Sequence, residues 1–399
     1  MYLLLIVACG QPNEPKDTDP AVDSGAIDGV RDADGDGIAQ ENDCNDHNPS
    51  PATAVETYAG DVNAENLAGF CDGYCVRNVD GDVAASGTTL SYLYDLRCVQ
   101  TISGALTIAN NDALDDITGL SGLSAVSALT VEHNPALTTL AGLENLTAVP
   151  GAVTLYNSDV LTDIHALSGL RFAGTLTLER LNALPNLEGL SALASVGDLK
   201  LLSNGAMTDV SGLDSLPGID GSLELGDNAS LHDLSAFSTL TYLNGDLNIH
   251  RSGKLRALTG LEHIPAVGAL TISGNDRLYD ISALAGLTAA ASMNFEYNKI
   301  LVDLDGLSGI TEVPGDVTLY GNVSLKDLGG LDGVTRIGGD LRLEQNGRLA
   351  DVRALYGVAT LSGNLDILDN AELLTADAEA LRDAIDSIGG TVTISGNAP

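Results

Sequence analysis

From residue 104 onward the chain repeats one pattern of apolar and polar positions. In the stretch GALTIANNDALDDITGLSGLSAVS, Leu106 and Ile108 alternate with polar residues, and later apolar residues recur about every third position. Alternation predicts a short half-buried strand, and the closer spacing predicts turns and short extended or 3-10 segments. The first apolar strand position recurs in steps of 23 or 24 residues, with a last step of 27, at Leu106, Leu129, Val153, Leu176, Leu199, Leu223, Leu247, Leu270, Met293, Val317, Leu341, Leu365 and Val392.

A fixed period of this length is typical of a solenoid, in which each coil stacks on its neighbours. Val83, preceded by Gly81, lies 23 residues before Leu106 and fits the same register, so we count it as the first coil. The pattern therefore predicts about 14 coils. The apolar positions that follow Val83 are irregular, as expected of a cap that covers the open end of the core.

A column of Asn repeats five residues after the first apolar strand position. Asn carries two donors and an acceptor, so the column predicts a ladder of amides that satisfies backbone groups at a turn. The three exceptions are Ser158, Leu181 and Ser252. The column consists of Asn111, Asn134, Asn204, Asn228, Asn275, Asn298, Asn322, Asn346, Asn370 and Asn397.

Gly and Asp form two further columns. Gly stands two residues before the strand in most coils, which predicts a corner with positive φ or close backbone passage. The Asp column predicts turn caps, because Asp bonds its own nearby backbone. Carboxylates spaced by roughly 4.8 Å also attract cations, and this stays the alternative. The Asp column consists of Asp116, Asp163, Asp209, Asp233, Asp280, Asp303, Asp327 and Asp351.

The last coil predicts a helix in place of the usual turns. Residues 375–388 read TADAEALRDAIDSI, in which Ala378, Leu381 and Ile385 recur at helical spacing. Thr375 is the expected N-cap, with acidic residues in the first turn. Such a helix explains the 27-residue step and caps the C-terminal end of the stack.

The repeat unit V-x-G-x-L-x-I-x-x-N-x-x-L-x-D-L-x-G-L-x-x-L resembles the receptor L domain, a relative of the leucine-rich repeat, over residues 75–399. The resemblance implies an all-β-rich solenoid, a right-handed β-helix-like stack that forms ligand-binding lobes in receptor ectodomains. The receptor role is not carried over, because this chain runs to about fourteen coils and has no transmembrane or kinase segment. An ordinary leucine-rich-repeat horseshoe is the alternative fold.

Residues 1–9, MYLLLIVAC, place a short apolar stretch before Cys9. Ile6-Val7-Ala8-Cys9 resembles a bacterial lipobox, in which a peptidase cuts before the Cys and the thiol then carries diacylglycerol. The resemblance implies an exported lipoprotein at the outer membrane or cell surface, held by its acyl chains. A truncated or misassigned start is the alternative, because the basic residues of an ordinary signal peptide are missing. Residues 10–31 are rich in Pro, Asp and Gly and predict a disordered acidic linker.

Residues 32–74 form an Asp-rich module and a connector. Its twelve-residue loop alternates carboxylates, then turns at Gly37 and ends on a carboxylate, which is the arrangement that binds a Ca²⁺ ion. The expected ligands are Asp32, Asp34, Asp36, the backbone carbonyl of Ile38, Gln40 and Asp43. Together with the following DCNDHNP, the loop resembles the thrombospondin type 3 repeat and a related metal-binding motif of bacterial surface proteins. An acidic linker without an ordered ion is the alternative.

Five Cys are present, and lipidation of Cys9 leaves four for disulfides. Four Cys suit two bridges in an exported protein and allow three pairings. We expect a Cys75–Cys98 bridge to staple the first coil, which leaves Cys44 to pair with Cys71.

Composition limits the classes of function. The formal net charge of −37 argues against nucleic acid and anionic membrane surfaces as partners, and it favours cations, basic partners or simple solubility. No Walker loop, G-x-S-x-G or H-E-x-x-H is present, and the six His share no slot in adjacent coils. We therefore expect a protein that is not an enzyme.

The outward side chains of the repeated strand form the natural binding surface of a solenoid. Tyr, Glu and His gather there, and Tyr offers rigid contact area with a hydroxyl. The candidate ligand-binding residues are Tyr156, Glu179, Glu224, His250, Glu296, Tyr320 and Glu344. These residues predict a surface-anchored binding or adhesion protein for a protein or glycan, with a calcium-stabilised N-terminal module. A spacer without a specific ligand and a polysaccharide-active β-helix enzyme are the alternatives.

Overall fold

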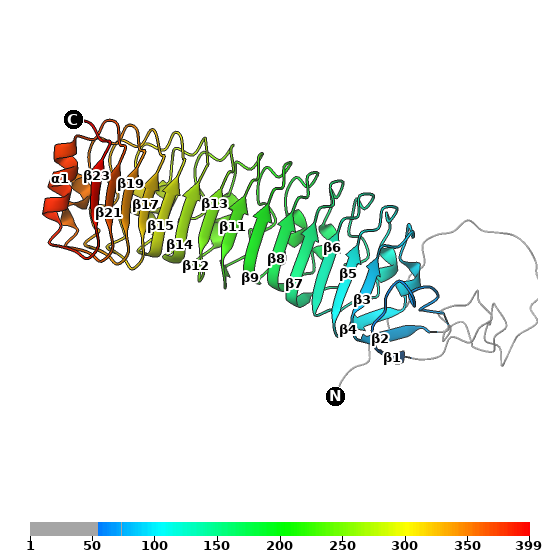
Figure 1. Ribbon diagram of the computed structural model, residues 1–399. Helices are drawn as coiled ribbons and strands as arrows, with labels where there is room; N and C mark the ends of the chain where they lie inside the picture. The colour runs from blue at the N-terminus through cyan, green and yellow to red at the C-terminus, as the bar shows by residue number, and fades with distance from the viewer. Residues whose placement is uncertain (1–54, 73) are drawn as a thin grey trace, which may run out of the picture.

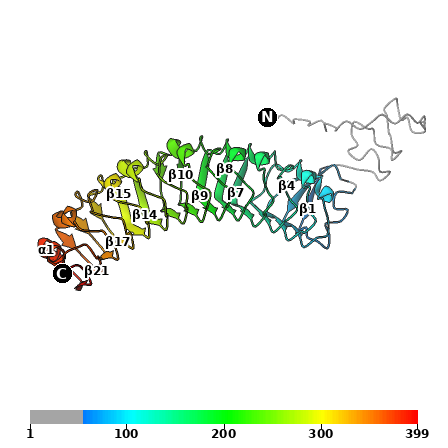
Figure 2. The same ribbon diagram turned by 90° about the horizontal axis from the view of Figure 1, so that it is seen from above.

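The computed structural model describes residues 55–72 and 74–399 as one elongated stack of coils (Figure 1). Seen from above, the stack curves, and short helices lie along its outer edge (Figure 2). The expected lipobox, linker and calcium loop fall outside the described residues, as does Cys44.

One parallel sheet of 14 strands runs the length of the stack, in the order β23-β21-β19-β17-β15-β14-β13-β11-β9-β8-β7-β6-β5-β3. Its strands are β3 Val83–Ser86, β5 Ala105–Ala109, β6 Ala128–Glu132, β7 Ala148–Tyr156, β8 Phe172–Glu179, β9 Ser195–Leu202, β11 Leu223–Gly226, β13 Leu247–His250, β14 Ala266–Ser273, β15 Ala289–Glu296, β17 Val317–Tyr320, β19 Leu341–Glu344, β21 Leu365–Leu368 and β23 Val392–Ser395. Every step pairs the predicted first apolar positions in register, from Val83↔Leu106 to Leu365↔Val392. The solenoid, its register and the count of about 14 coils are confirmed.

Shorter sheets and 3-10 helices form the other sides of the coils. The short sheets are β1-β2-β4, β10-β12 and β16-β18-β20-β22. Their strands are β1 Val55–Ala59, β2 Val76–Asp80, β4 Val99–Ile102, β10 Gly218–Ile219, β12 Tyr242–Leu243, β16 Glu312–Val313, β18 Arg336–Ile337, β20 Thr360–Leu361 and β22 Ser387–Ile388. The 3-10 helices are Tyr94–Leu96, Thr118–Leu120, His165–Leu167, Glu188–Leu190, Ser235–Thr239, Ser282–Gly286, Asp305–Leu307 and Arg353–Gly357.

The core is a continuous column of aliphatic side chains. In the second coil Leu106, Ile108, Leu114, Leu120 and Leu123 are all fully buried, and the strand positions stay buried in every later coil up to β21. In the last coil the first strand position, Val392, is exposed. Each coil buries its apolar side chains against the coils before and after it, so the hydrophobic stabilisation belongs to the interfaces between coils. Each coil is therefore stable only when it is stacked between its neighbours.

The predicted Asn ladder is present and buried. Asn298 donates from Nδ2 to the carbonyl of Ile272 at 2.8 Å, and its Oδ1 accepts the backbone N–H of Asn275 at 3.2 Å. The same pair of bonds recurs through the column, so each amide bridges its coil to the preceding one. These bonds satisfy backbone groups that the turn removes from the sheet ladder.

The residue just before the Asn slot is left-handed in all 14 coils, with φ between 48° and 70°. We call this set the left-handed column. The conformation turns the chain out of the strand, and it costs a non-Gly residue about 1 kcal/mol. The column consists of Gly87, Asn110, His133, Asn157, Arg180, Ser203, Asp227, Arg251, Gly274, Tyr297, Gly321, Gln345, Asp369 and Gly396.

The Asp column caps turns, as expected. Asp280 Oδ1 accepts the backbone N–H of Ser282 at 2.8 Å, and Asp327 does the same for Gly329 at 3.0 Å. In each of these coils one carboxylate oxygen of the Asp accepts a backbone N–H two residues later, which is the ordinary Asx-turn role. The corner Gly positions serve close passage: a Cβ at Gly315 would lie 2.8 Å from the carbonyl oxygen of Ala291 in the preceding coil.

The expected Cys75–Cys98 bridge is wrong, because Cys98 is joined to Cys71, with 5.4 Å between the Cα atoms. Cys75 is disulfide-bonded as well, so its pairing with Cys98 is excluded. The parallel ladder starts earlier than the predicted boundary at residue 75. Strand β1 pairs with β2, and Val62 bridges to Val83, so part of the expected connector stacks on the first coil. The Cys71–Cys98 bridge links this added layer to the coil above it.

Arg77, on β2, is a buried residue that links several segments at the N-terminal end of the stack. It is 8% exposed, and its guanidinium lies 3.9 Å from the ring centroid of Tyr74 and 4.2 Å from that of Phe70. Glu56 pairs with it at 2.9 Å, so the buried charge is both paired and stacked.

The predicted C-terminal helix is confirmed as α1, Thr375–Ala384, at the end of the stack (Figure 1). Its predicted N-cap is wrong, because Thr375 is the first helical residue and Leu374 precedes it without a side-chain cap. The Thr375 hydroxyl instead donates to the carbonyl of Ala398 at 2.8 Å. That bond ties the helix to the segment after β23.

Candidate functional site

Six of the seven candidate binding residues lie in one row on the 14-stranded sheet. This row is the third position after the first apolar strand residue, and we call it the outer row. It runs in register along the sheet. Its members include Glu132, Tyr156, Glu179, Leu202, Gly226, His250, Ser273, Glu296, Tyr320 and Glu344. The seventh candidate, Glu224, lies two residues earlier on its strand, in register with Lys200 and Asn248.

The outer row contains a Glu–Tyr–Glu triad on β6, β7 and β8. Glu132 and Glu179 flank Tyr156 on the two neighbouring strands. His133, from the left-handed column, packs edge-on against Tyr156 with ring centroids 5.1 Å apart. Arg180 reaches back from the next coil and donates to the Tyr156 hydroxyl at 3.1 Å. Two carboxylates, two rings and one guanidinium therefore meet here.

A second triad with the same order lies on β15, β17 and β19. Glu296 and Glu344 flank Tyr320. Tyr297, from the left-handed column, packs edge-on against Tyr320 with centroids 4.9 Å apart. Arg342 lies 5.3 Å from the Tyr320 ring and donates to Glu344 at 2.6 Å. The two sites thus share a Glu, a packed ring, a Tyr and a second Glu in the same order, and each holds an Arg beside the second Glu. The Arg comes from different places, because Arg180 follows Glu179 and Arg342 lies two residues before Glu344.

Tyr297, beside the second triad, is exposed, with 49% of its surface accessible. Its pKa is raised by a hydrogen bond to Tyr320, then by burial and by the negative charges around it, among them Glu296 and Glu344. The phenol therefore stays neutral. Gly321 makes room for it, because a Cβ there would lie 2.8 Å from the Tyr297 ring.

Between the triads, His250 sits in a cluster of charged residues. Its Nε2 lies 3.5 Å from Glu224 Oε1, and its ring covers Gly226, where any Cβ would overlap it. Its Nδ1 is 3.9 Å from Asp227, too far for a hydrogen bond, and has no hydrogen-bond partner among the described residues. Arg251 holds Asp227 with two bonds of 2.6 Å, which lowers the pKa of that carboxyl.

The scaffold pattern breaks beside these clusters. The Asn ladder is interrupted at Ser158 and Leu181, next to Tyr156 and Arg180, and again at Ser252, next to Arg251. Within the described chain, the buried side-chain atoms without a hydrogen bond all lie near the clusters: His133 Nδ1, Ser158 Oγ, Asn248 Oδ1, His250 Nδ1, Ser252 Oγ and Asn294 Oδ1. Buried polar atoms are ordinarily satisfied, so these coils give up scaffold bonds.

The sequence pattern missed the left-handed partners of the outer row. His133, Arg180, Arg251 and Tyr297 are large side chains held at positive φ, where Gly, Asn and Asp are the usual choices. Each of them contacts a cluster described above. Glycines in the slot before the Asn column were the available signal, because they mark the backbone conformation of the whole column.

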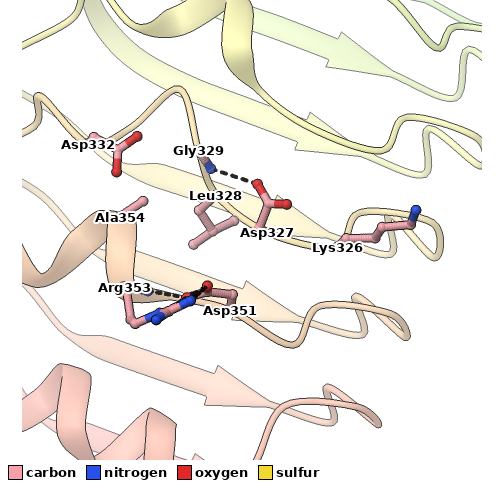
Figure 3. Close-up of a pocket in the computed structure, with 8 residues that line it drawn as sticks. All are labelled: Lys326, Asp327, Leu328, Gly329, Asp332, Asp351, Arg353 and Ala354. Carbon is pink, nitrogen blue, oxygen red and sulfur yellow. Dashed lines mark hydrogen bonds and ion pairs between the residues drawn. The ribbon is translucent and has the colours of Figure 1, made fainter.

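A surface hollow of about 410 Å³ lies on another side of the coils and brings Asp327, Asp351 and Arg353 together (Figure 3). Both carboxylates already cap turns, and Arg353 pairs with Asp351 and lowers the pKa of that carboxyl. A glycosidase acid needs a raised pKa to hold its proton. This hollow therefore gives no support to the polysaccharide-active alternative.

Metal and membrane features are limited to what the described chain shows. Within residues 55–72 and 74–399, no group of three or more His, Cys, Asp and Glu is placed to hold a metal ion. No helix in that part of the chain is long and apolar enough to cross a membrane. The calcium ligands expected at residues 32–43 and the lipid attachment expected at Cys9 lie outside it.

Comparison with known proteins gives likeness in structure alone. No protein-family model matches the chain, and no curated protein is significantly similar to it. Among solved structures, a leucine-rich-repeat protein from Leptospira interrogans is 15% identical, covering 83% of this chain and 98% of its own, with a TM-score of 0.27. Overlap this low supports no conclusion about function. The repeat solenoid rests on the strand registers.

Proposed function

We propose that this chain is a non-enzymatic binding or adhesion protein that uses the outer row of its sheet to hold a protein or glycan. The observation that carries the proposal is the pair of Glu–Tyr–Glu triads. Each triad places a packed aromatic pair and two carboxylates on a surface where other coils present residues without charge or aromatic ring, such as Leu202, Gly226 and Ser273. Rigid aromatic groups with charged neighbours are typical of recognition surfaces.

Loss of scaffold bonds supports the same proposal. A spacer without a ligand has no reason to interrupt its Asn ladder or to hold large side chains at positive φ, because both cost stability. The ladder is interrupted at the first triad and at His250, and large side chains at positive φ lie at both of these and, as Tyr297, at the second triad. Strained and unsatisfied groups concentrate where a protein binds or reacts, which favours a ligand over a plain spacer.

The finer assignment is part of the proposal. We take the solenoid as receptor L domain-like, preceded by a thrombospondin type 3-like loop that binds Ca²⁺ and by a lipid anchor at Cys9 that places the protein at the outer membrane or cell surface. Calorimetric titration of the full chain with Ca²⁺ tests the loop, with Asp34→Ala as the control variant. Heat that is the same for both proteins, or no heat at all, contradicts the calcium assignment.

The binding surface is tested on glycan and peptide arrays with the full chain. We compare the natural protein with a Tyr156→Ala/Tyr320→Ala variant. Tyr279→Ala is the matched control, because Tyr279 is 51% exposed and lies outside the outer row. The proposal expects ligands that the double variant loses and the control retains. Failure of the natural protein to bind on either array favours the spacer alternative.

A further inference from the structure

We propose that the two Glu–Tyr–Glu triads are equivalent subsites for cationic side chains, and that one extended basic polypeptide fills both at once. This inference rests on the proposed binding function and adds the chemistry of the ligand and its two-point attachment. The two subsites repeat one arrangement of charge and aromatic faces at two places on one row.

The charges in each triad leave one carboxylate available. Arg180 lies 3.9 Å from Glu179, and Arg342 pairs with Glu344, so each triad carries its own cation beside its second Glu. Glu132 and Glu296 have no ion-pair or side-chain hydrogen-bond partner among the described residues. These two are the equivalent members of the triads, each on the strand that precedes the Tyr. An incoming cation therefore has a free carboxylate at the same place in both.

Aromatic rings beside each free carboxylate favour a cation as well. His133 follows Glu132, Tyr297 follows Glu296, and each ring packs against the Tyr of its triad. Cations bind the face of a Tyr ring, and the Arg of each triad already lies over that Tyr. The chain as a whole has a net charge of −37, so a basic partner is also attracted over longer distances. The charge of the surface thus favours a basic polypeptide over a neutral glycan.

The spacing of the triads fits a single extended partner. Tyr156 and Tyr320 stand seven strands apart in the sheet order, on β7 and β17. At roughly 4.8 Å per strand, the separation is about 34 Å. An extended chain of about ten residues covers that length. The intervening outer row holds Leu202, Gly226, His250 and Ser273, of which the His250 ring covers Gly226. An extended partner would therefore pass over the His250 ring between the two triads.

The test uses synthetic peptides that carry two Arg-Arg pairs joined by proline spacers. Eleven prolines in the polyproline conformation span about 34 Å, and three prolines span about 9 Å. Both peptides have the same charge, and only the longer one is long enough to reach both triads. A difference in affinity therefore reports the second contact. We expect calorimetry to show binding of the longer peptide at least about tenfold tighter, because the second contact becomes intramolecular.

Variants locate the two contacts on the full chain. Glu132→Gln and Glu296→Gln keep the side-chain shape and should each reduce the affinity for the longer peptide to that for the shorter one. Glu312→Gln removes an exposed carboxylate on β16, outside the row, and should change neither affinity. Circular dichroism melts confirm that all three variants fold.

The outcomes separate this inference from the proposed function. Equal affinity for the two peptides, or affinity unchanged in both Gln variants, overturns the two-subsite inference. A glycan whose binding is lost in the Tyr156→Ala/Tyr320→Ala variant overturns the cationic assignment and leaves the proposed binding function standing. Absence of any ligand on peptides and arrays contradicts both.

Discussion

Two columns lie one residue apart in every coil and behave in opposite ways. The Asn column is nearly uniform, whereas the left-handed column before it holds eight residue types among 14 coils. The buried slot needs two donors and an acceptor in one place, and Asn alone among the residues of its size supplies them. The left-handed slot needs only a backbone angle, which many residues reach at a modest cost. The residue type can therefore vary in the left-handed column, and several of the candidate binding groups, such as Arg180 and Tyr297, stand in this column.

The largest difference in stability should appear when one residue of each column is replaced by Ala in the same coil. Asn346→Ala removes a donor to the carbonyl of Leu319 and an acceptor for the N–H of Asn322, and both backbone groups stay buried. We expect a loss of about 3 kcal/mol. Gln345→Ala changes an exposed residue that keeps its φ of 55° and should change stability by less than about 0.5 kcal/mol.

Urea denaturation of both variants measures the difference, read from the midpoint and the slope because repeat stacks can unfold in parts. Similar midpoints for Asn346→Ala and Gln345→Ala would remove the physical basis of the contrast between the columns.

Gly321→Ala tests whether the left-handed column also carries packing. The backbone angle alone costs about 1 kcal/mol, and the new Cβ lies 2.8 Å from the Tyr297 ring, so we expect about 2 kcal/mol in total. Gly87→Ala is the matched control, since φ there is 64° and no atom lies within 4 Å of the Cβ. The double variant Gly321→Ala/Tyr297→Ala should return to the Gly87→Ala value. If Gly321→Ala alone already equals that control, Tyr297 does not pack as described.

The repeat made most of the fold predictable from sequence. Strand positions, the buried Asn and the terminal helix follow from spacing, because each coil meets the same physical demands as its neighbours. The Thr375 cap failed because both its hydroxyl and its backbone N–H donate to the carbonyl of Ala398, which belongs to a later segment of the chain. The Cys71–Cys98 pairing depends on how β1 and β2 stack, and spacing alone leaves all three pairings open.

The candidate site was predictable in part. The outer row placed Tyr156 and Tyr320 correctly, since their strand position fixes their face. Their partners were missed because Arg180 and Tyr297 belong to the left-handed column, whose direction depends on backbone angles. Once the column is known to stack one coil on the next, the contact between Tyr297 and Gly321 in the following coil can be predicted from the sequence.

Ser252→Asn tests the interruption of the ladder. An Asn there regains the acceptor for the N–H of Asn228 and a donor to the carbonyl of Leu225, in the pattern of its neighbours. We expect the variant to be more stable by about 1 kcal/mol. Ser252→Asp keeps the acceptor and loses the donor while burying a charge, so it should be destabilised. A destabilised Ser252→Asn would show that the serine is itself a scaffold residue at this coil.

The smallest effect on stability is expected in the Asp column. The turn there requires a side-chain oxygen that accepts a backbone N–H, and it does not require that oxygen to be charged. Burial, together with repulsion from Asp305, Asp327 and Asp280, raises the pKa of Asp303. A raised carboxyl pKa costs stability above that pKa, and the cost disappears as the pH falls through it toward the unfolded value. Asp303→Asn keeps the turn acceptor, as Asn186 does in its own coil, and should stabilise at pH 7 by about 0.5 kcal/mol after solvent screening.

Asp351→Asn is the opposite-sign control, because Arg353 lowers the pKa of that carboxyl. Its charge stabilises the fold above the unfolded pKa, and that contribution is lost as the pH falls through the folded pKa. Thermal melts between pH 3 and pH 7 should therefore show Asp303→Asn above the natural protein and Asp351→Asn below it at pH 7, with both differences shrinking in acid. If both variants are less stable than the natural protein at pH 7, the charge of Asp303 stabilises its turn as well, and the Asp column requires more than an acceptor. If both are more stable, the pair with Arg353 contributes no net stability.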